Sequence, residues 1–247
     1  MYSEPRFLPA GERALVVEFG NEIAPEINAR LRALTAALAA APVPGVVEVV
    51  PTYRSLLVHF DPLTVAPEAL EERLAHLAGN LGELKLPEPE VTVVPVCYGG
   101  EFGPDLPFVC EHTGLSAEEV IRLHTGTDYL IYMLGFTPGF SYLGGMDERI
   151  ATPRLKTPRT KIPAGSVGIA GKQTGIYPID SPGGWQLIGR TPLKLYDPFR
   201  EPPVLLAAGN YVRFTAVTNE EYDAIAAQVA AGTYRVQVEP KGEGRGA

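Results

Sequence analysis

Cysteine is scarce in this chain of 247 residues, which holds only Cys97 and Cys110. Neither lies in a CxxC pair or beside a histidine at metal-ligand spacing, so we expect free, buried or half-buried thiols and no metal site. No apolar run reaches the roughly 18 residues that a membrane span needs, and the N-terminal residues lack the basic and apolar regions of a signal peptide. These absences predict a cytoplasmic protein without a membrane span.

Positive charge is also in short supply, because 21 Lys and Arg stand against 29 Asp and Glu, a formal net charge of −8. Binding to nucleic acid needs a basic surface that neutralises phosphates, so this balance argues against a general nucleic-acid binder. The sequence contains no GxxxxGK[ST] phosphate loop and no HExxH or GxSxG motif. The catalytic residues therefore stay unassigned at this stage.

The first third of the chain shows the periodicities of a mixed α/β fold. The expected elements are a strand at 14–19, a helix at 23–41, strands at 46–50 and 55–60, a helix at 67–78 and a strand at 91–96. Apolar residues recur at helical spacing in the first helix and alternate in the strand at 55–60. The order β-α-β-β-α-β is that of a split βαβ, or ferredoxin-like, α+β domain, which we place at residues 1–90.

The pattern of apolar residues is different in the rest of the chain. Two short helices are expected between 104 and 124, the second opened by a capping box of Ser116 and Glu119, and we interpret 91–127 as a connector. Beyond Asp128, short apolar runs alternate with Gly and Pro, which is typical of a β-barrel or sandwich. A helix capped by Thr218 or Asn219 closes this domain, placed at 128–240.

The stretch from Gly135 to Arg190 is unusually dense in glycine and proline. Glycine allows close approach of a ligand or of another backbone, although a turn is an equally good explanation for any single glycine. Aromatic and polar residues are interleaved here, as in binding pockets. We predict ligand contacts from Lys161, Gln173, Tyr177, Asp180, Gln186 and Arg190, and apolar walls or core packing from Phe136, Phe140 and Trp185.

Five basic residues also cluster between 149 and 161 in this acidic chain. They are Arg149, Arg154, Lys156, Arg159 and Lys161. Arg binds carboxylates and phosphates through paired hydrogen bonds, so Arg154 and Arg159 are candidate anion contacts. A solvated loop paired with acidic neighbours, or a subunit surface, is the alternative.

Long motifs in these regions resemble one family. They are YRSLLVHFDP at 53–62, PVCYGGEFGPDL at 95–106, DYLIYMLGFTPGFSYLGGMD at 128–147 and PAGSVGIAGKQTGIYPIDSPGGWQLIGRTPLKLYDP at 163–198. The chain resembles the family of 5-oxoprolinase B subunits, also described as allophanate hydrolase subunit 1 or as the Kip histidine-kinase inhibitor family. The resemblance covers residues 10 to 225, roughly.

The resemblance implies a fold, partners and an activity. It implies an N-terminal α+β domain and a C-terminal cyclophilin-like β-barrel. It also implies that the A and C subunits of 5-oxoprolinase join this chain to cleave 5-oxo-L-proline to L-glutamate with ATP and Mg at the level of the complex, the chain being inactive alone. Inhibition of a sensor histidine kinase is the alternative function, and prolyl isomerisation is a third. We expect the glycine-dense half of the barrel to form a shared hollow, closed by the C subunit.

Overall fold

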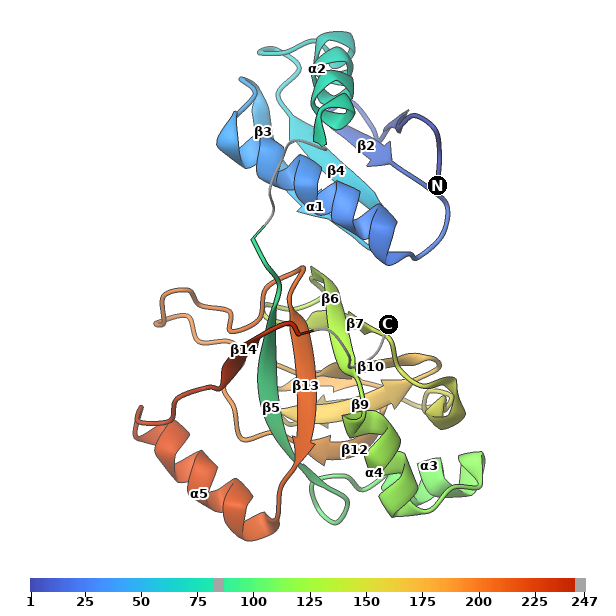
Figure 1. The fold of residues 1–247 in the computed structure, drawn as a ribbon, viewed down its shortest axis with the longest axis vertical. Coiled ribbons are helices and arrows are strands. Elements are labelled where there is room, and N and C mark those ends of the chain that lie inside the picture. The colour runs from blue at the N-terminus through green and yellow to red at the C-terminus, as the bar shows by residue number, and fades with distance from the viewer. Residues whose placement is uncertain (82–86, 243–247) are drawn as a thin grey trace. The chain divides into compact units, whose positions relative to one another are not determined.

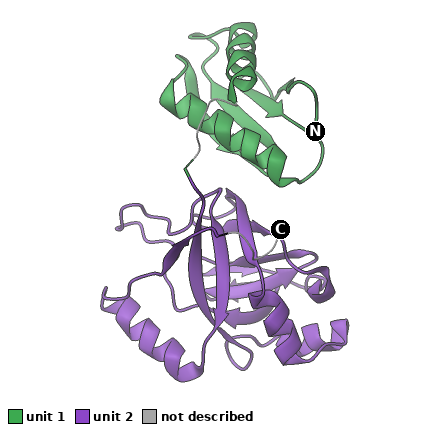
Figure 2. Cartoon of the chain, viewed as in Figure 1, with its two compact units in different colours: residues 1–87 green, residues 88–247 purple. Residues whose placement is uncertain are grey.

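The computed structural model describes residues 1–81 and 87–242. The chain forms two compact units, residues 1–87 and 88–247, which Figure 2 colours separately. Each unit has its own hydrophobic core. Over the described ranges, no helix is long and apolar enough to cross a membrane. The free thiols expected from the sequence are confirmed, with Cys97 buried and Cys110 half-buried.

The N-terminal unit combines an antiparallel sheet with two helices (Figure 1). Its elements are β1 (Arg6–Pro9), β2 (Ala14–Glu18), α1 (Pro25–Ala40), β3 (Val46–Pro51), β4 (Ser55–Phe60) and α2 (Pro67–Gly79). The strand order is β1-β2-β4-β3. Both helices begin with proline, whose fixed φ suits the first helical position.

The core of this unit follows the sequence periodicity closely. Ile27, Leu31 and Leu34 of α1 are fully buried, as are Leu56 and Val58 of β4. Helical spacing brings the first three to one face, and alternation brings the last two to one face of the sheet. The predicted helices and the strands at 14–19, 46–50 and 55–60 are therefore confirmed, with small shifts at their ends.

The predicted last strand of this unit is the exception. Residues 91–96 lie in β5 (Glu90–Tyr98), which belongs to the C-terminal unit, and the edge beside β2 is filled by β1 instead. β5 is buried along most of its length, as a central strand is, whereas an edge strand over two helices would alternate. The βαβ part, with β4 between β2 and β3, is present, but the ferredoxin-like order does not include 91–96.

The C-terminal unit is a nearly closed β-barrel. After β5 come α3 (Leu106–Thr113), α4 (Ala117–Thr125), β6 (Asp128–Leu134), β7 (Ser141–Gly144), the 3₁₀ turn Glu148–Ile150, β8 (Arg159–Ile162), β9 (Ser166–Ala170), β10 (Gln173–Ile176), β11 (Ser181–Gly183), β12 (Gln186–Arg190), β13 (Tyr211–Ala216), α5 (Asn219–Ala230) and β14 (Val238–Pro240). The sheet runs β10-β9-β12-β5-β13-β6-β7, with β14 on β5. β10 lies next to β7, which nearly closes the barrel, and β8 pairs with β11 in a separate ribbon.

Residues 91–127 are part of this barrel, so the predicted connector is wrong. β5 pairs with β12, β13 and β14, and α3 and α4 pack on β12 and β13. Leu106, Val109, Val120 and Leu123 of the two helices share one core with the strands. These apolar residues are buried in the core of the barrel, so the segment belongs to this unit.

The helix caps are close to those expected. Ser116 accepts a hydrogen bond from the Glu119 amide (3.2 Å), but the Glu119 carboxylate binds Arg122 (2.6 and 2.9 Å), so only the serine half of the predicted capping box forms. Thr218 caps α5 in a complete capping box with Glu221. The cap satisfies amide groups at the helix start that have no partner within the helix.

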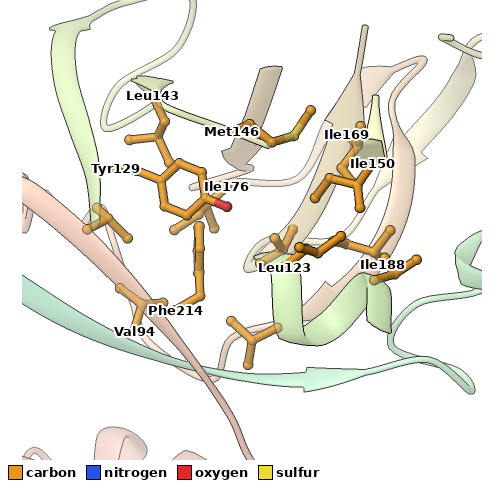
Figure 3. Packing of buried hydrophobic residues seen from close by; sticks show 14 of the residues in the cluster. Val94, Leu123, Tyr129, Leu143, Met146, Ile150, Ile169, Ile176, Ile188 and Phe214 are labelled. Atoms are coloured by element: carbon orange, nitrogen blue, oxygen red, sulfur yellow. The ribbon is translucent and has the colours of Figure 1, made fainter. Parts of the chain in front are cut away.

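A buried histidine, His124, ties the barrel core together beside the rings shown in Figure 3. Its Nδ1 lies 2.8 Å from the Tyr98 hydroxyl, and its Nε2 lies 2.8 Å from the Thr174 hydroxyl. Thr174 donates its own proton to the Gly168 carbonyl (3.1 Å), so it accepts from Nε2–H, and Nδ1 accepts from Tyr98. Burial lowers the pKa of His124 to about 3, and the neutral ring satisfies both partners.

Candidate functional site

A hollow of about 190 Å³ opens on the barrel unit, and most of its wall is aromatic. The lining residues of this aromatic hollow are Phe136, Phe140, Tyr142, Arg154, Tyr177, Pro182, Gly183, Gly184 and Trp185. Phe136 and Phe140 come from the β6–β7 loop and Tyr142 from β7, while Tyr177 and Trp185 flank β11. Segments distant in the sequence thus supply one cavity.

Phe140 is the centre of the aromatic wall. Its ring centroid lies 5.6 Å from that of Phe136, 5.2 Å from Tyr142, 5.8 Å from Tyr177 and 5.8 Å from Trp185, and every pair is edge-to-face. In this geometry the positive edge of one ring meets the negative face of another, which fixes the orientation of both. The wall is therefore ordered by ring-to-ring contacts.

Glycines make room for these rings. A Cβ at Gly175 would stand 3.1 Å from the Trp185 ring and 3.5 Å from Phe140, and one at Gly183 would collide with the Tyr177 hydroxyl. Part of the glycine density that suggested a ligand therefore seats aromatic side chains instead. The glycines still mark the hollow, because the aromatic rings that they accommodate form its walls.

Phe136 stands at the hollow in a strained conformation. Its φ is +65°, and the Thr137 amide donates to the Gly135 carbonyl (2.8 Å), which closes a three-residue γ-turn around it. Positive φ is costly for a bulky side chain. The side chain is 67% exposed, so the strain does not serve to bury it. Such backbone strain clusters at binding and catalytic sites.

Arg159 holds the backbone around Trp185. Its guanidinium donates to Asp105 Oδ1 (2.7 Å) and to the Trp185 carbonyl (3.3 Å). The other Asp105 oxygen accepts from the Leu187 amide (2.6 Å), and the Asp105 amide donates to the Leu187 carbonyl (2.9 Å). Arg159, predicted as an anion contact, does not line the hollow. It holds the backbone of Trp185, which does.

Arg154, the other predicted anion contact, does line the hollow. Its guanidinium carbon lies 5.8 Å from the centroid of the Trp185 ring, and the side chain is exposed. Within residues 1–81 and 87–242, no carboxylate lies within ion-pair distance of it. It is the single charged side chain in the lining.

Lys161 and Asp180 pair with each other away from the hollow. Lys161 Nζ lies 2.8 Å from Asp180 Oδ2, and Asp180 Oδ1 accepts from the Ala164 amide (2.8 Å). The pair raises the pKa of Lys161 and, with that amide, lowers the pKa of Asp180. Both side chains are exposed, and the pair joins β8 to the segment before β11.

The remaining predicted contacts also lie elsewhere. Gln186 is buried and donates from Nε2 to the Pro153 carbonyl (2.9 Å). Arg190 ends β12, and its guanidinium lies 5.5 Å from the Phe102 ring. Gln173 begins β10 and is half-buried. None of the three lines the hollow. Phe136, Phe140, Arg154, Tyr177 and Trp185 thus line one hollow, whereas Lys161, Gln173, Asp180, Gln186, Arg190 and Arg159 do not line it.

Sequence reasoning missed Tyr142 and Asp105. Tyr142 lies two residues after Phe140 at the start of β7, and this spacing places both on one face of an extended segment. That alternation was a usable signal. For Asp105, nothing local indicated that its carboxylate would reach Leu187 and Arg159, which follow it by 82 and 54 residues.

Two wider grooves border α5, one of about 390 Å³ and one of about 550 Å³. They share Leu193, Lys194, Asp197, Val229 and Gly232, and no predicted site residue lines either of them. Over the part of the chain that the structure describes, no cluster of three or more His, Cys, Asp or Glu is arranged to hold a metal ion. The aromatic hollow is therefore the cavity on which the sequence and the structure agree.

Comparison with known proteins places the chain among its relatives. Residues 5–206 match the family "Carboxyltransferase domain, subdomain C and D". The chain is 46% identical to the B subunit of 5-oxoprolinase from Bacillus subtilis over 87% of this chain and 93% of that protein, and 44% identical to the protein of the same name from Escherichia coli O157:H7 over 83% and 92%. The crystal structure of the K. lactis urea amidolyase has the same fold, with a TM-score of 0.77 and 23% identity over 96% of this chain and 16% of that one. The chain belongs to the family of 5-oxoprolinase B subunits.

Proposed function

We propose that this chain is the B subunit of an ATP-dependent 5-oxoprolinase, which cleaves 5-oxo-L-proline to L-glutamate. The observation that carries the proposal is the 46% identity to the Bacillus subtilis protein over nearly the full length of both chains. None of the comparisons favours the kinase-inhibitor alternative. The proposal also places the protein in the cytoplasm.

The proposed reaction needs activation by ATP. The lactam of 5-oxoproline is a stable amide, and ATP activates it by phosphorylating its oxygen, which creates a leaving group. The aromatic hollow does not fit Mg-ATP, because its volume is about 190 Å³ and its lining offers a single cation. We therefore assign ATP to a partner subunit and substrate contacts to this one.

The A and C subunits of 5-oxoprolinase complete this proposal as partners. Support comes from the K. lactis urea amidolyase, in which the region similar to this chain makes up 16% of a much longer polypeptide. The aromatic hollow is open on one side, and we propose that it is covered by the C subunit. The nearly closed barrel also supports the cyclophilin-like class that the family resemblance implies.

Reconstitution tests the proposed function. The purified chain is combined with the A and C subunits from the same organism, and ATP hydrolysis dependent on 5-oxo-L-proline is measured. We expect activity from the three together, and none from this chain alone or from the other two without it. Full activity of the isolated chain would contradict the composite site, and an inactive mixture of three folded subunits would contradict the proposed reaction.

A further inference from the structure

The charge pattern around the aromatic hollow points to the chemistry of its ligand. In the basic segment 149–161, Arg149 pairs with Asp147 (2.6 Å), Arg159 with Asp105 (2.7 Å) and Lys161 with Asp180 (2.8 Å). Arg154 has no such carboxylate among the described residues, and it is the member of the segment that lines the hollow. The hollow thus keeps one uncompensated positive charge at an aromatic wall.

This arrangement selects against some ligands. A cation would be repelled by Arg154, although aromatic walls alone would attract one. A purely apolar ligand would leave the guanidinium unused. An arginine binds a carboxylate through two parallel hydrogen bonds, and such bonds strengthen where neighbouring rings exclude water. A ligand with a carboxylate at one end and an uncharged ring at the other uses both features.

The size of the hollow limits the ligand further. Pockets for drug-sized molecules measure about 300–1,000 Å³. At about 190 Å³ the hollow is smaller and suits a single small ring. Gly183 and Gly184 border it, and a Cβ at Gly183 would collide with the Tyr177 hydroxyl. Because Phe140 and Trp185 are held by ring contacts and by the Arg159–Asp105 pair, the hollow is formed without a partner chain.

We propose that this chain by itself binds a small cyclic monocarboxylate in the aromatic hollow, with the carboxylate on the Arg154 guanidinium and the ring against Trp185 and Phe140. The proposal deepens the proposed function, on which the choice of 5-oxo-L-proline as the cyclic carboxylate rests. Binding precedes closure by any partner, and it does not require ATP.

Trp185 offers a direct probe, because it is the only tryptophan of the chain and it lines the hollow. The full-length chain is titrated with 5-oxo-L-proline while the intrinsic tryptophan emission is recorded. Two control compounds each carry one part of the ligand. 2-Pyrrolidinone has the ring without the carboxylate, and acetate has the carboxylate without the ring. We expect a saturable change with 5-oxo-L-proline at millimolar or lower concentration, and much weaker binding of both fragments.

Two variants identify the charge that matters. Arg154→Gln removes the cation of the hollow and should weaken binding about tenfold or more, as expected for the loss of a charge-assisted pair. Lys156→Gln removes a neighbouring exposed cation that does not line the hollow, and it should leave the binding midpoint unchanged. The midpoint is compared, because Arg154 lies 5.8 Å from the Trp185 ring and its loss is expected to change the emission intensity even without ligand. Matching thermal unfolding curves would show that both variants are folded.

Several results would overturn the inference. They are the absence of a saturable signal from the folded chain, equal midpoints for the two variants, binding of 2-pyrrolidinone as tight as that of 5-oxo-L-proline, and binding that appears only after addition of the C subunit. Binding by the isolated chain together with an inactive reconstituted complex would leave this inference standing and refute the proposed reaction. The two proposals can therefore fail separately.

Discussion

The barrel core around His124 and the aromatic hollow both combine aromatic rings with a few polar groups, but they treat those groups differently. In the core, both nitrogens of His124 have partners at 2.8 Å and the ring is fully buried. In the hollow, Arg154 lacks a carboxylate partner within the described ranges and Phe136 is exposed on a strained backbone. A satisfied buried network rigidifies a fold, whereas an unmatched charge beside a cavity is available to a ligand.

The largest expected effect is a difference in stability between substitutions in the barrel core and at the aromatic hollow. Phe214 is 1% exposed and packs on Tyr129 with ring centroids 5.3 Å apart. Phe214→Ala should lower the free energy of unfolding by about 3–5 kcal/mol, as for other buried aromatic residues. Trp185→Ala should cost less, because part of its ring faces the hollow and has no packing partner there. Urea unfolding followed by circular dichroism measures both, and a larger loss for Trp185→Ala would break the comparison.

Acid should act on the core through His124. Burial lowers its pKa from 6.5 to about 3, so between these values the unfolded chain binds a proton that the folded chain does not. The free energy of unfolding therefore falls as the pH decreases from 6.5 towards 3, by several kcal/mol in order of magnitude. Urea unfolding at a series of pH values measures the slope. His124→Gln should remove much of it, and an unchanged slope would show that other groups cause it.

A smaller loss of stability is expected from removing Arg159, which supports Trp185 beside the hollow. Arg159→Ala removes the hydrogen bonds to Asp105 and to the Trp185 carbonyl, and should lower the free energy of unfolding by about 1–3 kcal/mol. Because Trp185 then loses part of its support, its emission maximum should move to longer wavelength. Arg159→Lys keeps one charge near Asp105 and should show a smaller shift. An unchanged emission maximum in Arg159→Ala would mean that Arg159 does not position Trp185.

The smallest expected effect belongs to a residue predicted from sequence as a ligand contact. Lys161 pairs with Asp180 on the surface and does not line the hollow. Lys161→Ala should leave both the thermal midpoint and the 5-oxo-L-proline titration unchanged, since exposed ion pairs contribute little to stability. Weaker ligand binding by this variant would show that the site extends from the hollow to Lys161 in β8.

The local structure could be predicted well from the sequence. Helical spacing in α1 and alternation in β4 set which side chains are buried, and both patterns are visible in a short window. The same window indicated that 91–96 is a strand, but its nearly continuous burial can arise in any central strand. Which sheet it joins is decided by pairing with β12 and β13, which begin 96 and 121 residues after the start of β5.

The aromatic part of the candidate site was more predictable than its charged part. Phe136, Phe140, Tyr177 and Trp185 gather because large rings near glycines pack on one another, a tendency that composition reveals. The charged residues were harder to place, because an Arg or Lys near an anion site looks the same in sequence as one that is paired. Only the geometry separates Arg154 from Arg159.

A crystal structure of this 247-residue chain with 5-oxo-L-proline would locate the bound ligand. We expect the ligand in the aromatic hollow, with both carboxylate oxygens within hydrogen-bond distance of the Arg154 guanidinium and the ring against Trp185. Ligand bound in the grooves beside α5, or a hollow that stays empty when the ligand is saturating, would contradict this expectation.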